Sequence, residues 1–244
     1  MKDRMIDLLD QWRSTAFQNG DRNFVGDGLL YKSINSENMW ENSPHRVAFI
    51  GKEPYFRNYK NYDKKYLSGE NYSDYDILGL SINHRFWRNI LTWTYGLFHA
   101  RADSYSEFEK ACSYPNREYV VRNIPVSFVN IKKEVGSSSA SNTTLRKYVK
   151  RYQDFLKCQL QEILRPNILF CCGTSGLVMN EVYDNYNFKK IDDEGYMYFC
   201  EHDNIMLIAS YHPTARISNI HMYNGVMNAY SGFLKQYSWG YNKP

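Results

Sequence analysis

Four short apolar runs constrain the fold of this chain more than any other feature. They span residues 46–50 (RVAFI), 126–129 (VSFV), 167–172 (NILFCC) and 204–209 (NIMLIA). Each run has the length of a strand, and its apolar residues are continuous rather than alternating. Continuous runs are typical of strands that are covered on both faces in a parallel sheet.

Helical patterns lie between these runs. Residues 85–100 and 144–164 place apolar side chains at helical spacing, with Ser141 or Asn142 as a candidate N-cap of the second helix. Further helices are predicted over residues 3–17, 175–183 and 223–237. The alternation predicts a three-layer α/β/α sandwich with a central, mainly parallel four-stranded sheet. We expect a single domain over residues 1–244, with a long polar loop insertion at about 52–76.

Charge and cysteine content restrict the class of protein less sharply. The formal net charge of +4 neither requires nor excludes nucleic acid, so a DNA partner has to be argued from local residues. None of the five cysteines has C-x-x-C spacing, so we expect no metal, no iron–sulfur cluster and no other cofactor. With no signal-peptide pattern and no apolar run of about 18 residues, we expect a soluble cytoplasmic monomer that does not bind membranes.

Polar segments follow all four apolar runs. The first run leads into residues 51–56, the second ends in Asn130, the third leads into residues 173–176, and the fourth leads into residues 212–216. In open α/β sheets, ligands bind outside the carboxyl ends of the strands. The sequence therefore predicts a carboxylate, an amide, a histidine and two loops of small residues around one cleft.

These segments carry a resemblance to a known family. Residues 51–56 (GKEPYF) resemble the first motif of the uracil-DNA glycosylase superfamily, GQDPYH, and residues 212–216 (HPTAR) resemble its second motif, HPSPL or HPSPR. Residues 128–130 (FVN) resemble the family strand that ends in the pyrimidine-reading Asn. The resemblance spans roughly residues 46–237, and it implies a uracil-DNA glycosylase-like fold and an enzyme that flips a base out of DNA.

The resemblance implies roles for three residues. Glu53 stands where the family has a catalytic Asp, which stabilises the developing charge on the sugar and orients water. His212 is the donor to O2 of the leaving base, and Asn130 offers a donor and an acceptor to the pyrimidine edge. The alternatives are a salt-bridged loop carboxylate, a structural histidine and a strand-end turn.

The remaining candidate residues would hold the base or the DNA. The base-binding set is Gly51, Lys52, Tyr55, Phe56, Leu80 and Asn130, in which Tyr55 would close the pocket near C5 of the base and Leu80 replaces a stacking Phe. The DNA-binding set is Ser137, Ser138, Ser139, Thr174, Ser175, Thr214 and Arg216. Small residues and backbone N–H groups would contact phosphates, and Arg216 would fill the space left by the flipped base or bind a phosphate.

Several functions remain open at this point. The leading hypothesis is a monofunctional glycosylase that removes uracil or a modified pyrimidine and leaves an abasic site, as in DNA repair. A second is a glycosylase for bulky 5-substituted, phage-type cytosines that acts in anti-phage defence. A catalytically silent member that binds DNA or a protein partner is a third, and an unrelated hydrolase of nucleosides is a fourth, although the chain has no G-x-S-x-G elbow.

Overall fold

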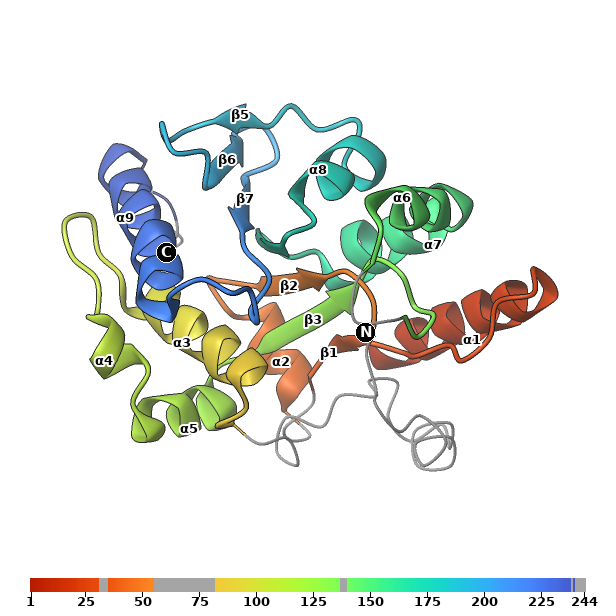
Figure 1. Ribbon diagram of the computed structural model, residues 1–244, viewed down its shortest axis with the longest axis horizontal. Coiled ribbons are helices and arrows are strands. Elements are labelled where there is room, and N and C mark those ends of the chain that lie inside the picture. The colour runs from red at the N-terminus through yellow and green to blue at the C-terminus, as the bar shows by residue number, and fades with distance from the viewer. Residues whose placement is uncertain (31–34, 55–81, 137–139, 238, 240–244) are drawn as a thin grey trace.

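The computed structural model describes residues 1–30, 35–54, 82–136, 140–237 and 239. Within them the chain forms one seven-stranded sheet with helices on both faces (Figure 1). The strands are β1 (Gly28–Leu29), β2 (Val47–Gly51), β3 (Val126–Asn130), β4 (Ile168–Cys172), β5 (Lys189–Lys190), β6 (Met197–Cys200) and β7 (Ile205–Ser210). The helices are α1 (Lys2–Gln18), α2 (Ser36–Glu41), α3 (Arg85–His99), α4 (Phe108–Ala111), α5 (Tyr114–Asn123), α6 (Asn142–Arg151), α7 (Gln153–Lys157), α8 (Ser175–Leu177) and α9 (Asn219–Gln236). Most of the predicted insertion at about 52–76 lies outside the described residues.

The four apolar runs form the parallel centre of the sheet, as predicted. In the order β3-β2-β4-β7 each strand pairs in parallel with the next. All four begin and end within one residue of the predicted runs, and β2, β3 and β4 are buried along their whole length. Burial on both faces explains why these strands read as continuous apolar runs.

The prediction of a four-stranded sheet was wrong, because three antiparallel strands extend it. β1 pairs with β3 at one edge, while β6 and then β5 follow β7 at the other. β1 and β5 are two residues long and β6 is four, so none of them produces an apolar run that stands out in the sequence. The fold is therefore α/β with a mixed sheet.

The sheet lies between two hydrophobic clusters, one on each face. Successive side chains of a strand point to opposite faces, and in β2 Phe49 joins one cluster while Ala48 and Ile50 join the other. The Phe49 cluster includes side chains of α3, α5 and α9, and the opposite cluster includes side chains of α1, α6 and α7. Figure 1 shows these two groups of helices on opposite sides of the sheet.

The predicted helices over residues 3–17 and 85–100 are confirmed, whereas the longest predicted helix, over 144–164, is not continuous. α3 and α1 match their predicted spans closely, and Ser141 caps α6 by accepting a hydrogen bond from the backbone N–H of Thr144 at 3.1 Å. The predicted helix over 144–164 is interrupted at Tyr152, and α7 continues as a wider π-type helix over Cys158–Leu164. The predicted helix at 175–183 consists of α8 and a second π-type segment, Val178–Val182. None of the described helices combines the length and apolar character of a membrane span.

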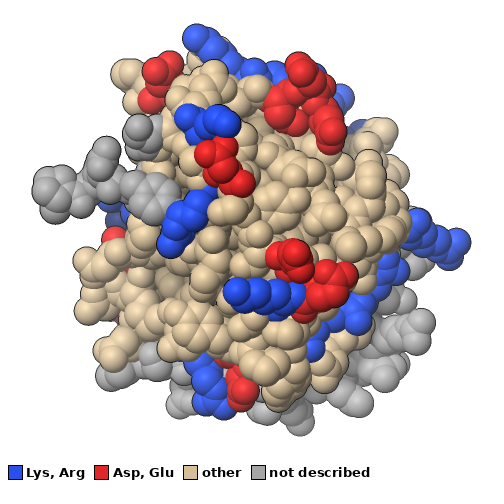
Figure 2. Space-filling model, turned by 90° about the vertical axis from the view of Figure 1, so that its left-hand side faces the viewer, with Lys and Arg blue, Asp and Glu red and all other residues tan. Residues whose placement is uncertain are grey.

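Charge on one side of the molecule is balanced. Figure 2 shows the side that carries α4, α5 and α9, where acidic and basic side chains are interspersed on a mainly uncharged surface. Lys235 pairs with Asp103 at 2.9 Å and Arg122 pairs with Glu118 at 2.8 Å. A surface that binds DNA phosphates is expected to be dominated by unpaired cations, so the described part of this side does not favour DNA binding.

Candidate functional site

The polar segments after the four central strands meet at one edge of the sheet. Gly51 at the end of β2 lies opposite Asn130 at the end of β3. The backbone N–H of Lys132 donates to the carbonyl of Lys52 at 3.0 Å, so the two chains stay together past the sheet. After β4, the N–H of Gly173 donates to the carbonyl of Ser210 at 2.8 Å. The predicted convergence of these strand ends is confirmed.

His212 is held in one tautomer by its own loop. The backbone N–H of Thr214 donates to Nδ1 at 3.2 Å, and the Thr214 hydroxyl lies 2.9 Å from the same nitrogen. A ring nitrogen that accepts from a backbone N–H carries no proton, so the neutral ring has its proton on Nε2. Nε2–H is therefore a donor whose direction is fixed by the Nδ1 contacts.

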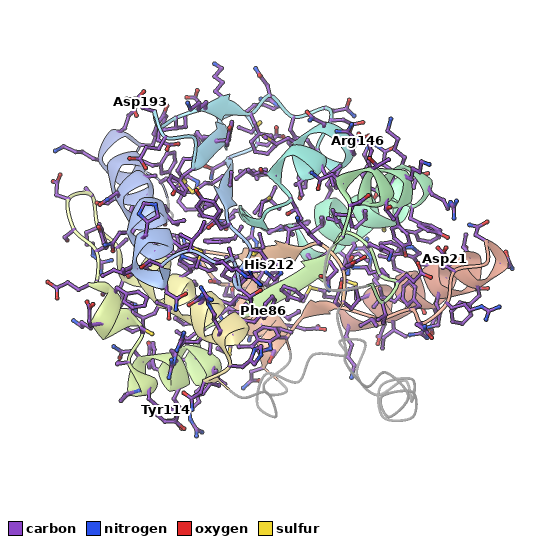
Figure 3. All side chains as sticks on the ribbon, viewed as in Figure 1. Asp21, Phe86, Tyr114, Arg146, Asp193 and His212 are labelled. Atoms are coloured by element: carbon purple, nitrogen blue, oxygen red, sulfur yellow. The ribbon has the colours of Figure 1, made fainter. Side chains whose placement is uncertain are left out.

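Helix α3 fixes the loop that carries His212. Asn89 donates to the carbonyl of Pro213 at 2.7 Å, and Arg85 donates to the carbonyls of Ala215 and Ile217 at 2.7 and 2.9 Å. The ring of Phe86, on the same helix, lies 5.7 Å from the His212 ring between centroids. Figure 3 shows His212 and Phe86 next to each other near the centre of the molecule. The position of the His212 imidazole is therefore fixed by contacts with helix α3 as well as by its own loop.

Burial and a neighbouring lysine keep His212 neutral. Burial lowers the pKa of His212, and the positive charge of Lys52 lowers it further. A Cβ placed on Gly173, whose φ is +73°, would lie 3.5 Å from Cε of Lys52 and 3.9 Å from the backbone N of His212. Lys52 has no acidic partner among the described residues, so its ammonium group adds a positive charge to this edge of the sheet.

Replacing Lys52 by Met should raise the pKa of His212, because a nearby cation disfavours the imidazolium. The His212 ring of the variant would then become protonated at a higher pH than in wild type. As the pH is lowered, any activity that needs the neutral ring would be lost at a higher pH in the variant. An NMR titration of the histidine signals in Lys52→Met and wild type measures the shift. Lys189→Met, which removes a charge on the exposed strand β5, is the control. An unchanged His212 titration in Lys52→Met would place the ammonium away from the ring.

The side chain of Glu53 is largely covered and is paired with a lysine. Its Oε2 accepts from Nζ of Lys132 at 3.0 Å, and the two side chains are only 8% and 9% exposed. Nζ of Lys132 also lies 3.5 Å from Glu134. A Cβ placed on Gly136 would overlap the carboxyl group of Glu53, so this carboxylate occupies the space that a side chain at position 136 would need. Glu53 is thus fixed by one cation and one glycine.

Asn130 is buried at the end of β3, and Asp27 holds it there. The carboxylate Oδ2 of Asp27 accepts from the backbone N–H of Asn130 at 2.9 Å and lies 3.4 Å from its side-chain Nδ2. The other end of the amide, Oδ1, would be 2.6 Å from a Cβ placed on Gly51. A side chain at position 51 would therefore displace the amide, which explains the glycine.

The other candidate residues differ in how far they are exposed to solvent. Thr174 is buried, and its hydroxyl donates to the carbonyl of Ile50 at 2.8 Å, so it joins β4 to β2. Ser175 is half-buried at the start of α8, whereas Thr214 and Arg216 are exposed. The remaining candidates lie outside the described residues: Tyr55, Phe56, Leu80, Ser137, Ser138 and Ser139.

Sequence reasoning missed the residues that hold the site from behind. These are Asp27, which binds Asn130, and Arg85 and Asn89, which bind the His212 loop. Asp27 belongs to no motif and is 103 positions from its partner. One signal was available, because the two consecutive lysines 132 and 133 after a buried strand need acidic partners if they are buried.

A groove of about 690 Å³ lies at the opposite edge of the sheet. Arg46, Arg165 and Asp203, which precede β2, β4 and β7, are part of its lining. The lining holds charges of both signs and no histidine among the described residues, so it does not offer the same set of groups. Within the described part of the chain, no three His, Cys, Asp or Glu side chains are arranged to hold a metal ion.

The sequence matches no protein-family model and no curated protein.

Proposed function

We propose that this protein is a monofunctional DNA glycosylase that flips uracil or a modified pyrimidine out of DNA and hydrolyses its bond to the sugar. The observation that carries the proposal is His212, a neutral imidazole whose backbone contact leaves the proton on Nε2, at the same sheet edge as Glu53 and Asn130. A carboxylate, an amide and a neutral imidazole are the groups that pyrimidine removal needs.

The reaction assigns one task to each group. Water bonds to C1′ of the sugar, the C1′–N1 bond breaks, and the electron pair leaves with the base. Glu53 orients the water and accepts its proton, and its charge stabilises the positive sugar. Nε2–H of His212 donates to O2 of the base as negative charge develops there. Asn130 pairs with the edge of the flipped base.

One observation favours a second candidate, a catalytically silent protein that binds DNA or a partner. Glu53 is nearly inaccessible and already bonded to Lys132. A carboxylate with a permanent cationic partner has less negative charge to offer a sugar cation and less room for water. In this alternative the Glu53–Lys132 pair has only a structural role.

A base-release assay separates the two candidates. Oligonucleotides carrying one uracil, one 5-hydroxymethylcytosine, one glucosylated cytosine or only normal bases are incubated with the protein and then treated with alkali, which breaks the strand at abasic sites. We expect cleavage at one modified base by wild type and none by Glu53→Gln. Cleavage of glucosylated cytosine fastest would indicate phage defence, and cleavage of uracil fastest would indicate repair. No cleavage with DNA binding intact would establish the silent protein.

A further inference from the structure

Asp27 and Lys133 form a buried ion pair directly behind Asn130. Both side chains are 0% exposed, and Oδ1 of Asp27 accepts from Nζ of Lys133. Lys133 also donates to the backbone carbonyl of Asn130 at 2.9 Å and lies 5.0 Å from the ring centroid of Trp12. The pair therefore contacts Asn130 through its backbone N–H, its carbonyl and its side-chain amide.

Burying the Asp27–Lys133 pair costs free energy, because both charges lose their hydration. Gln159 also holds Asp27 in place. Burial raises the pKa of Asp27 and lowers the pKa of Lys133. The positive charge of Lys133 partly offsets the rise at Asp27, and the negative charge of Asp27 partly offsets the fall at Lys133. Nε2 of Gln159 donates to the carbonyl of Asp27 at 2.8 Å and lies 3.3 Å from its carboxylate. Buried ion pairs are often no more stabilising than apolar residues of the same size. A contribution to stability alone is thus a weak reason for the pair.

The carboxylate determines which way round the Asn130 amide lies. An amide turned by 180° would bring Oδ1 against Oδ2 of Asp27, and two acceptors repel. Nδ2 therefore faces Asp27, and Oδ1 faces Gly51. The same Oδ2 also accepts from the backbone N–H of Asn130. The order of acceptor and donor on the Asn130 amide is therefore fixed.

A fixed order distinguishes the two kinds of pyrimidine. Uracil presents a donor at N3 and an acceptor at O4, whereas cytosine presents an acceptor at N3 and a donor at N4. An amide matches one of these edges in one orientation and the other only after it turns. We propose that Asp27, held by Lys133, is the positioning residue that fixes the amide of Asn130 and makes the site discriminate between uracil-type and cytosine-type bases. This inference rests on the proposed glycosylase function.

The test measures a ratio of rates rather than a rate. Single-turnover base release is measured on single-stranded oligonucleotides of one sequence that carry uracil, cytosine or 5-hydroxymethylcytosine at one position. Asp27→Asn lets either amide orientation find a partner. Because this variant leaves Lys133 buried without a counter-charge, the double variant Asp27→Asn/Lys133→Met, which removes both charges, is measured beside it. Ser231→Ala is the control, because it removes partly buried hydrogen bonds from α9 to the carbonyls of Arg101 and Ala102.

We expect the ratio of uracil-type to cytosine-type rates to move toward one by at least about tenfold in the Asp27 variants, the scale of one lost polar match. The ratio should be unchanged in Ser231→Ala, because a purely structural defect lowers both rates together. Folded Asp27 variants that keep the wild-type ratio overturn the inference while the glycosylase function stands. A wild-type protein that releases no base overturns the proposed function and this inference with it.

Discussion

His212→Ala should lower the single-turnover rate of base release by roughly 10²–10³-fold, the effect of removing one donor from an oxyanion site. The reason is the fixed tautomer: the backbone N–H of Thr214 occupies Nδ1, so the only ring proton is on Nε2. Because this donor is already aligned before the reaction, its loss appears in the chemical step. Quenched single-turnover assays on the best substrate measure it.

The control for His212→Ala is His202→Ala, which removes an exposed imidazole from the turn before β7, at the other end of that strand. It should release base at the wild-type rate. Thr214→Ala keeps the backbone N–H and removes only the hydroxyl, so its loss should be smaller than that of His212→Ala. A His212→Ala protein as fast as wild type would remove the imidazole from the mechanism.

The centre of the fold could be predicted from the sequence because strands that are buried on both faces appear in the sequence as continuous apolar runs. The residues of β2, β3, β4 and β7 are largely apolar and do not alternate with polar ones, and the rule for parallel sheets then places Glu53, Asn130 and His212 at one edge. The edge strands have no such runs. β1 and β5 are two residues long and are defined by their pairing with neighbours rather than by their own side chains.

The contacts around the site could not be predicted for a different reason. Glu53 is paired with Lys132, 79 positions away, and Asn130 with Asp27, 103 positions away. Which charged residues pair at such separations depends on how the loops fold, and no periodic pattern in the sequence indicates it. The same holds for the glycine at position 136, whose role becomes visible only through the carboxylate that lies against it.

Gly136→Ala should reduce base release by about 10²-fold, although residue 136 has no side chain that could take part in the reaction. The new methyl group would overlap the carboxyl group of Glu53, and a displacement of about 1 Å at a reacting group costs on this scale. The backbone N–H of residue 136 donates to the carbonyl of Pro54 at 2.9 Å, which limits how far the loop can retreat. The carboxylate, rather than the loop, is therefore expected to move and to lose its contact with Lys132.

Two comparisons make this result specific. Gly232→Ala adds the same methyl group at an exposed position of α9, where nothing lies within 4 Å of it, and should match wild type in rate while being slightly more stable to heat, because alanine favours a helix over glycine. Glu53→Gln keeps the shape of the side chain and removes its charge, and it should lose about 10²–10⁴-fold, the range for a general base. If Gly136→Ala and Glu53→Gln both fold and only the second is slow, the reaction needs the negative charge of Glu53 but does not depend on the exact position of its carboxylate. If both fold and both keep the wild-type rate, Glu53 is a structural partner of Lys132, and the silent binding protein becomes the better description of this chain.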